Sequence, residues 1–237
     1  MPKAKLELIQ DPNMYLFLEQ GIRGGISTIT KRYAQANNKY MSNFDPSNPS
    51  KYIMYFDVNN LYCWAMSQAL PLENFKYESP ELWNEENIIQ IPDEGDTGSV
   101  FKVDLEYPEE IHDNHNCLPV AAEKMKINKA MLSSYQLNLS DKLGFKISGS
   151  NSKLIPNLSN KSKYVAHFRN LKLYKELGLR ITHVFAALSF KQSPWLESYI
   201  RYNIEQRIKA KISFEKNFFE LMNNAVFGKT NWRTGPT

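Results

Sequence analysis

The stretch Val100–Tyr107 constrains the fold most, because apolar and charged side chains alternate along it without interruption. Successive side chains of a β-strand point to opposite faces of the sheet. The apolar positions are Phe101, Val103, Leu105 and Tyr107, and the charged ones are Lys102, Asp104 and Glu106. The pattern predicts a strand of an antiparallel sheet with one buried and one solvated face.

Elements of both kinds are predicted around this strand. Ile181–Phe190 has strand character, and Phe168–Leu177 is predicted to be a helix closed by Gly178, which readily takes the positive φ of a helix C-terminus. Residues 72–98 are acidic and loop-like, whereas residues 133–163 are predicted to be irregular or to form short hairpin strands. The breakers of the first of these segments are Pro92, Gly95 and Gly98.

The last third of the chain is predicted to be helical. Ser193-Pro194 has the residue types of a helix start, a hydroxyl cap followed by proline. A second helix is expected over Phe214–Val226, with a break near Ala210–Ser213. An apolar stripe recurs every four residues at Leu196, Ile200, Ile204, Ile208 and Ile212.

One carboxylate stands inside an apolar run. Tyr52–Val58 has no alternation, which predicts a strand buried on both faces, and Asp57 is its only charged residue. Burying an unpaired carboxylate is costly, so Asp57 is expected either to cap the short helix predicted over Leu61–Ala69 or to hold a cation.

Composition limits the class of protein. The 237 residues are 42% hydrophobic and carry a net charge of +4, which suits a packed core and permits a nucleic-acid partner. The sequence has two cysteines, Cys63 and Cys117, which are too few for a disulfide framework, so a reducing compartment is expected. With no membrane-spanning run and no apolar signal core, we expect an intracellular protein, nuclear or cytoplasmic and not secreted.

The residues from Asp57 to Tyr62 resemble a polymerase motif. Asp57-Val-Asn-Asn-Leu-Tyr62 is similar to the D-x-x-S-L-Y-P signature, motif A, of family B DNA polymerases, with Asn60 and Cys63 in place of serine and proline. The resemblance implies that Asp57 and the backbone carbonyl of Val58 bind Mg²⁺ (or Mn²⁺). It further implies that Tyr62 packs under the sugar of the incoming dNTP.

A second segment resembles motif B, K-x-x-x-N-S-x-Y-G, from the fingers of the same family. Asn224, Phe227 and Gly228 occupy the asparagine, tyrosine and glycine positions, which implies contacts with the nucleotide. Glu220 stands where the family has a phosphate-binding lysine, and a carboxylate there would repel a triphosphate. Arg207 and Lys216 are the cations expected to contact the phosphates instead.

Ile22-Arg-Gly-Gly25 is similar to the Y-x-G-G element of the family, which implies that Arg23, Gly24 and Gly25 touch the template strand. Three further segments, in their order and spacing, resemble the protein-primed polymerases of Polinton (Maverick) transposons and their viral relatives. They are residues 107–115, 164–171 and 190–195. The zinc alternative for the cluster His112, Asp113, His115 and Cys117 is weaker than a polar loop, because its spacing is compact and no second ligand pair follows.

The resemblance implies an α+β fold, a partial polymerase palm whose antiparallel sheet carries Asp57, with helical fingers. Four regions are expected: a connector at 1–45, the palm with an insertion at 46–190, fingers helices at 191–230 and a divergent tail at 231–237. The sequence contains no Y-x-D-T-D-S motif C, and we expect the thumb and the exonuclease domain to be missing as well.

The function implied is template-directed dNTP addition by two-metal transfer in a full-length parent, with this chain alone inactive. The expected partners are a DNA template-primer, dNTP and a terminal protein primer, with no membrane. The alternative is a co-opted or decayed palm remnant that only binds DNA or nucleotide.

Overall fold

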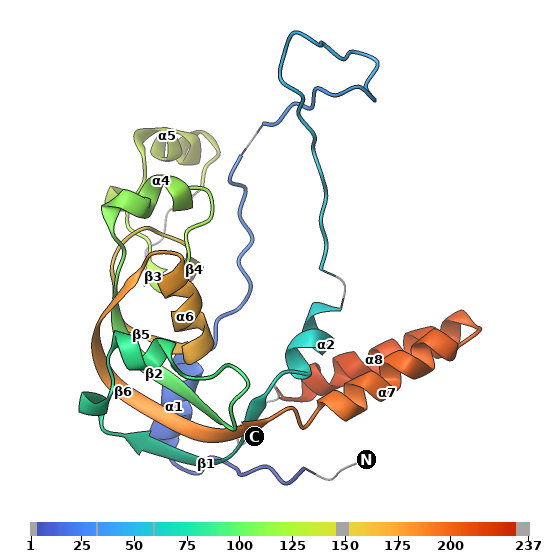
Figure 1. The fold of residues 1–237 in the computed structure, drawn as a ribbon. Helices are drawn as coiled ribbons and strands as arrows, with labels where there is room; N and C mark the ends of the chain where they lie inside the picture. The colour runs from blue at the N-terminus through green and yellow to red at the C-terminus, as the bar shows by residue number, and fades with distance from the viewer. Residues whose placement is uncertain (1–3, 32, 59, 146–151, 231–237) are drawn as a thin grey trace.

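The computed structural model describes residues 4–31, 33–58, 60–145 and 152–230, with the side chains of the last four of these excluded. It mixes helices with antiparallel sheet, as the α+β prediction requires (Figure 1). The helices are α1 Pro12–Gly21, α2 Leu61–Met66, α3 Glu85–Ile89, α4 His112–His115, α5 Ser134–Lys142, α6 Phe168–Glu176, α7 Glu197–Lys209 and α8 Ser213–Thr230, with 3₁₀ turns η1 Pro80–Leu82, η2 Glu109–Ile111 and η3 Lys129–Met131. The strands are β1 Leu70–Glu78, β2 Thr97–Glu106, β3 Glu123–Lys126, β4 Ser152–Ile155, β5 Lys161–His167 and β6 Arg180–Ser193.

Four strands form the main sheet in the order β1-β6-β2-β5, and every neighbouring pair is antiparallel. The predicted alternating strand is β2, and it lies inside the sheet between β6 and β5. Its register places Phe101 opposite Ala187 of β6 and opposite Ala166 of β5. Strands β3 and β4 form a separate two-stranded sheet.

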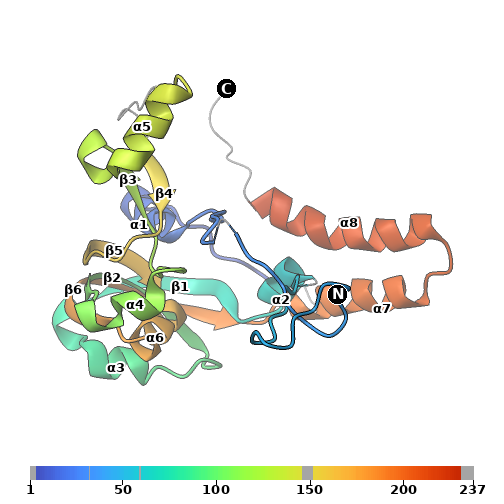
Figure 2. The same ribbon diagram turned by 90° about the horizontal axis from the view of Figure 1, so that it is seen from above.

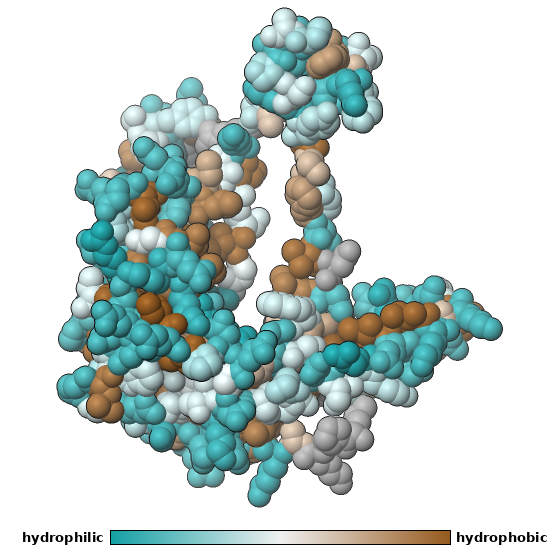
Figure 3. Space-filling model, viewed as in Figure 1, coloured by the Kyte–Doolittle hydropathy of each residue, from teal (hydrophilic) through white to brown (hydrophobic). Residues whose placement is uncertain are grey.

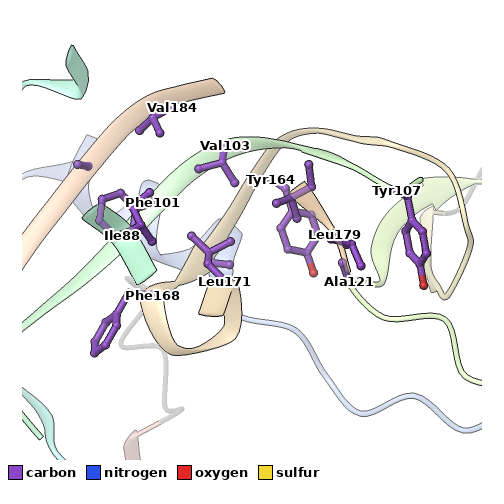
Figure 4. Close-up of a cluster of buried hydrophobic side chains, with 13 residues drawn as sticks. Ile88, Phe101, Val103, Tyr107, Ala121, Tyr164, Phe168, Leu171, Leu179 and Val184 are labelled. Atoms are coloured by element: carbon purple, nitrogen blue, oxygen red, sulfur yellow. The ribbon is translucent and has the colours of Figure 1, made fainter. Parts of the chain in front are cut away.

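Each face of the main sheet carries its own core. On one face, Phe101, Val103 and Leu105 pack with Leu171 of α6 and Ile88 of α3, and each of these side chains is at most 1% exposed (Figure 4). On the opposite face, α1 contributes Phe17, Met14 and Leu18 to a cluster on the sheet residues Val100, Val165, Leu188 and Phe190. The second face of β2 is therefore partly covered by α1 rather than fully solvated.

The prediction that residues 72–98 form a loop is wrong, because most of this segment belongs to β1, η1, α3 and the start of β2. Gly98, predicted to interrupt secondary structure, lies within strand β2. A Cβ on Gly98 would lie 2.5 Å from a ring carbon of Phe190 and closer still to the amide oxygen of Gln192. Glycine is present here because two side chains of the neighbouring strand approach its backbone closely, which a loop pattern does not reveal.

Other boundaries were predicted in part. Helix α6 ends at Glu176, one residue before the predicted end, and Gly178 has the expected positive φ, at +99°. Helix α7 begins three residues after the predicted proline start, at Glu197, since the residues before it form a turn closed by Glu197 N–H to Pro194 C=O at 3.0 Å. The irregular region around residue 140 contains α5, which has a capping box at Ser133.

The predicted buried strand at Tyr52–Val58 is wrong. These residues belong to a long segment, residues 22–31 and 33–58, that we call the arm. It leaves the sheet, turns at its far end and returns to α2 (Figures 1 and 2). Residues 52–58 make no strand pairing, and Tyr55 and Phe56 are 91% and 79% exposed. Asp57 is consequently not carried by the main sheet, because no described strand lies beside it. Apolar surface follows the arm in Figure 3.

Candidate functional site

Motifs A and B face one another across a cleft of about 650 Å³. Its lining comes from the end of the arm and α2 on one side and from α7 and α8 on the other. Figure 1 shows α2 beside the α7–α8 hairpin. Its walls include Asp57, Val58 and Tyr62 of motif A, Arg207 of α7, and Glu220 and Asn224 of α8. Residues more than 160 positions apart in the sequence thus meet at one site.

A left-handed turn positions the motif A side of the cleft. Asn60, at φ 62° and ψ 31°, is the N-cap of α2 and precedes its first residue, Leu61. The alternative role of Asp57 as the helix cap is wrong, because Asn60 occupies the cap position and provides no side-chain cap hydrogen bond. Asparagine tolerates this conformation better than most residues.

Helix α2 is anchored by a small core. Cys63 and Met66 pack on Ile200 of α7, and Cys63 is only 2% exposed. Burial raises the pKa of the Cys63 thiol, so it remains protonated and acts as a small apolar side chain. Cys63, which replaces the family's proline, therefore fits α2 against the helical hairpin.

The motif B side is a hairpin of two helices joined by a buried amide pair. Asn203 of α7 donates from Nδ2 to Oδ1 of Asn223 in α8 at 2.9 Å, and both residues are at most 4% exposed. The Tyr199 hydroxyl donates to the carbonyl of Met222 at 3.1 Å. These contacts fix the rotation of α8, which places Glu220 and Asn224 in the wall of the cleft. No sequence signal identified the Asn203–Asn223 pair.

The charge arrangement in the cleft differs from the family pattern. Arg207 Nη2 lies 3.0 Å from Glu220 Oε2, with both side chains about half exposed, at 53% and 51%. The cation expected to contact phosphate is thus paired with the carboxylate that replaces the family's lysine. The cleft therefore has two carboxylates and one arginine among its walls, an arrangement that attracts a triphosphate less than a lysine would.

Of the residues predicted for nucleotide binding, Tyr62, Arg207 and Asn224 line the cleft, whereas Lys216 does not. Lys216 lies on the exposed surface of α8, one turn before Glu220. Phe227 and Gly228 lie within α8, and their side-chain environments are outside the described part of the structure.

The three residues predicted to touch template lie at the base of the arm. Arg23 is held by the body: its guanidinium carbon lies 3.8 Å from the centre of the Tyr164 ring, and Nη1 donates to the carbonyl of Val165 at 2.7 Å. A Cβ added at Gly24 or Gly25 would meet nothing within 4 Å, so their backbone is open to a ligand.

A divalent ion fits the donor types of the cleft. Mg²⁺ prefers oxygen ligands, and the exposed Asp57 with the neighbouring Val58 offers a carboxylate and a carbonyl of that kind. Across the described residues, no three His, Cys, Asp or Glu side chains gather closely enough to hold a metal. His115 and His112, from the zinc alternative, instead contact the hydroxyl and carbonyl of Tyr107, at 2.7 and 3.1 Å.

A search for membrane spans among the described helices found none of sufficient length and apolarity. No curated protein matches the sequence.

The fold is similar to that of Phi29 DNA polymerase. In an orthorhombic crystal form of that enzyme, the match has a TM-score of 0.53 at 16% identity and covers 97% of this chain and 33% of the polymerase. Its ternary complex with primer-template DNA and incoming nucleotide substrates matches with a TM-score of 0.47 at 18% identity, covering 95% of this chain and 32% of that one. The chain spans about a third of the length of these structures.

The sequence matches a family model over residues 8–234, nearly its whole length, and that model describes type B DNA polymerases of organellar and viral origin. The motif A and motif B residues that meet in the cleft lie within this range. The chain therefore belongs to the organellar and viral type B DNA polymerase family.

Proposed function

We propose that the cleft is the nucleotide half of a DNA polymerase active site, which adds dNTPs to a protein or DNA primer in a longer parent. The observation that carries the proposal is the meeting of Asp57 and Tyr62 with Arg207 and Asn224 in one cavity. In the reaction, the primer 3′-hydroxyl attacks the α-phosphate of the dNTP, a new phosphodiester bond forms and pyrophosphate leaves.

Each residue has a role that its place in the cleft allows. Asp57 and the Val58 carbonyl would hold Mg²⁺ or Mn²⁺, which when bound neutralises charge on the phosphates. The ring of Tyr62 would lie beside the sugar and exclude a 2′-hydroxyl sterically. Asn224 would face the nascent base pair, and Arg207 would contact the triphosphate after leaving Glu220.

The 237 residues alone are expected not to extend a primer. Two-metal transfer needs at least two carboxylates that converge on the ions. In the described part of the cleft, the carboxylate other than Asp57 is Glu220, which is engaged by Arg207. A further carboxylate supplied by another segment would complete the site.

Mg²⁺-dependent binding of a fluorescent dNTP tests the proposal. Wild type is compared with Asp57→Asn and with the matched control Asp141→Asn, which changes an exposed aspartate of α5 far from the cleft. We expect the Mg²⁺-dependent part of the binding to disappear in Asp57→Asn and to persist in Asp141→Asn. Equal binding by all three proteins would contradict the proposal.

A primer-extension assay with the same proteins tests the expected inactivity. Extension by wild type that disappears in Asp57→Asn would show that a second carboxylate is already present. Binding of DNA and dNTP without extension would agree with a polymerase-derived piece. The second candidate function is a palm remnant that binds DNA or nucleotide without catalysis, and the same assay result is expected of it. The observation that favours this candidate is the Arg207–Glu220 ion pair.

A further inference from the structure

The far end of the arm has features that the cleft does not use. We define the tip as residues 33–52, where the arm turns and returns. In Figures 1 and 2 the tip lies at the end of two extended stretches, apart from the sheet. Its surface is therefore open on several sides.

Hydrogen bonds within the tip close it into a defined loop. Asn37 and Lys51 form a two-way backbone bridge, with N···O distances of 2.9 and 2.7 Å. The side chain of Asn37 spans the loop, donating to the carbonyl of Asp45 and accepting from its N–H, both at 2.9 Å. The turn of the tip is thus closed by hydrogen bonds between its own residues.

Cations dominate this part of the chain. Between residues 27 and 56 the sequence contains four cations and one carboxylate, namely Lys31, Arg32, Lys39, Lys51 and Asp45. The carboxylate of Asp45 is occupied by its own turn, where it accepts from Ser47 N–H at 2.9 Å and from Asn48 Nδ2 at 2.7 Å. The hydrogen bonds keep Asp45 ionised, and the four cations against one carboxylate leave residues 27–56 with a net charge of +3.

Tyrosines accompany the cations in the sequence. Lys39-Tyr40 and Lys51-Tyr52 are repeated dipeptides on the two sides of the bridge, and Tyr33 follows another basic pair. The tyrosines at positions 33, 40 and 52 are 77%, 79% and 56% exposed. Exposed rings next to cations bind unpaired nucleic acid, because bases stack on the rings while the cations pair with phosphates.

Tyr40 is held in place although its ring is exposed. Its N–H donates to Oδ1 of Asn38 at 3.1 Å, and Asn38, only 8% exposed, donates to the carbonyl of Lys51 at 3.2 Å. The ammonium of Lys39 lies 5.2 Å from the centre of the Tyr40 ring. These contacts hold the backbone of Tyr40, while its ring, 79% exposed, is open to a stacking base.

We propose that the tip is a binding site for single-stranded DNA, which stacks its bases on Tyr40 and its neighbouring tyrosines while the lysines contact the phosphates. The five residues from Tyr52 to Phe56 then lead from the tip to Asp57, a span of at most about 17 Å in extended chain. A strand held at the tip is therefore directed toward the cleft. The direction toward the cleft rests on the proposed function, whereas the binding itself does not.

The test measures the anisotropy of a labelled oligo-dT of about 12 nucleotides with the full chain and its variants. We expect Tyr40→Ala to weaken binding about tenfold, and Tyr40→Phe, which keeps the ring, to bind like wild type. The double variant Lys39→Gln/Lys51→Gln should lower the slope of log K against log salt by about 1.4, since each lost phosphate contact removes about 0.7. The charge control Lys76→Gln, on β1, should leave binding unchanged.

Duplex DNA and oligo-rU of equal length are the competing ligands that test the specificity of the site. Binding of the duplex should change little in Tyr40→Ala, because paired bases are not available for stacking on the ring. Equal losses in Tyr40→Ala and Tyr40→Phe, no loss in either, or tighter binding of oligo-rU than oligo-dT would each overturn the inference. Tyr33→Ala serves as the second ring variant if Tyr40→Ala does not melt cooperatively.

The same proteins separate this site from the cleft. Mg²⁺-dependent dNTP binding should persist in Tyr40→Ala and disappear in Asp57→Asn, while oligo-dT binding should show the reverse pattern. Failure of dNTP binding in wild type would contradict the proposed function and leave the tip result standing. Loss of oligo-dT binding in Asp57→Asn to the same extent as in Tyr40→Ala would contradict a separate tip site.

Discussion

The sheet body and the region around the cleft use similar apolar side chains in opposite ways. In the body, residues 70–193, Phe101 and Leu171 are completely buried between the sheet and α6. In the arm and the helical hairpin, Phe56 and Ile208 are 79% and 77% exposed. The main sheet and α6 therefore bury Phe101 and Leu171 against each other, whereas no described neighbour buries Phe56 of the arm. The difference indicates where stability resides and where binding is to be expected.

The sharpest test of this difference compares two identical substitutions. Phe101→Ala should lower the free energy of unfolding by about 3–5 kcal/mol, because it leaves a cavity among packed side chains. Phe56→Ala, in the arm, should change it by less than about 0.5 kcal/mol. Urea denaturation followed by circular dichroism measures both. Similar losses in the two variants would mean that Phe56 is packed as tightly as Phe101 and would contradict the comparison.

A histidine in the body should make its stability depend on pH. His167 caps α6 and stacks near Phe168 and Phe190, and burial lowers its pKa to about 4 from an ordinary 6.5. The unfolded chain therefore binds a proton between pH 6.5 and 4 that the folded chain does not bind. The free energy of unfolding, at its full value above pH 6.5, should fall by about 3 kcal/mol as the pH is lowered to 4.

His167→Asn tests this titration, because asparagine does not ionise and still offers a side-chain acceptor at the helix start. The variant should show a smaller loss of unfolding free energy between pH 6.5 and 4, by about the same 3 kcal/mol. Denaturant titrations at several pH values measure the slopes. Parallel slopes for the two proteins would show that His167 ionises alike in the folded and unfolded chain.

The sequence predicted the body better than the site for a physical reason. Strand β2, helix α6 and strand β6 were recognised because their apolar faces meet partners within the chain, so that periodicity reports burial. The run Tyr52–Val58 has the same apolar character, yet its described neighbours provide no strand, and the expected burial is absent. Periodicity shows what a segment prefers to contact, but it cannot show whether the contact is made.

For the cleft, the motif residues Asp57, Tyr62 and Asn224 were found from the sequence, and the structure brings them to one cavity. Helix α8 could be predicted, but its rotation could not, because it depends on the buried Asn203–Asn223 pair, which has no local pattern. For the same reason the partner of Glu220 was not foreseen. Arg207 lies on another helix, 13 positions away, and meets Glu220 only after the hairpin has folded.

Removing the Asn203–Asn223 hydrogen bond should have a smaller effect on stability, confined to the α7–α8 hairpin. Asn223→Ala should destabilise the hairpin by about 1–3 kcal/mol, because the buried amide of Asn203 loses its partner. The control Tyr199→Phe removes the more exposed hydroxyl bond to Met222 and should cost about 0.5–1.5 kcal/mol. Hydrogen exchange of the amides in α7 and α8 reports the change. Faster exchange spread evenly over the sheet body would contradict a contribution confined to the hairpin.

The smallest effect on stability should accompany a clear change in ligand binding. Arg207 and Glu220 are both about half exposed, so Glu220→Gln should alter the free energy of unfolding by less than about 1 kcal/mol. The same substitution releases Arg207 and removes a negative charge from the cleft, and the affinity for dNTP should rise about five- to tenfold at low salt. Glu220→Lys should increase it further, whereas Arg207→Gln should decrease it. Because Glu215→Gln removes a charge from the same helix outside the cleft wall, it serves as the control. If Glu215→Gln raised the affinity as much as Glu220→Gln, the gain would reflect net charge alone, and the ion pair would have no specific part in holding Arg207 away from the nucleotide.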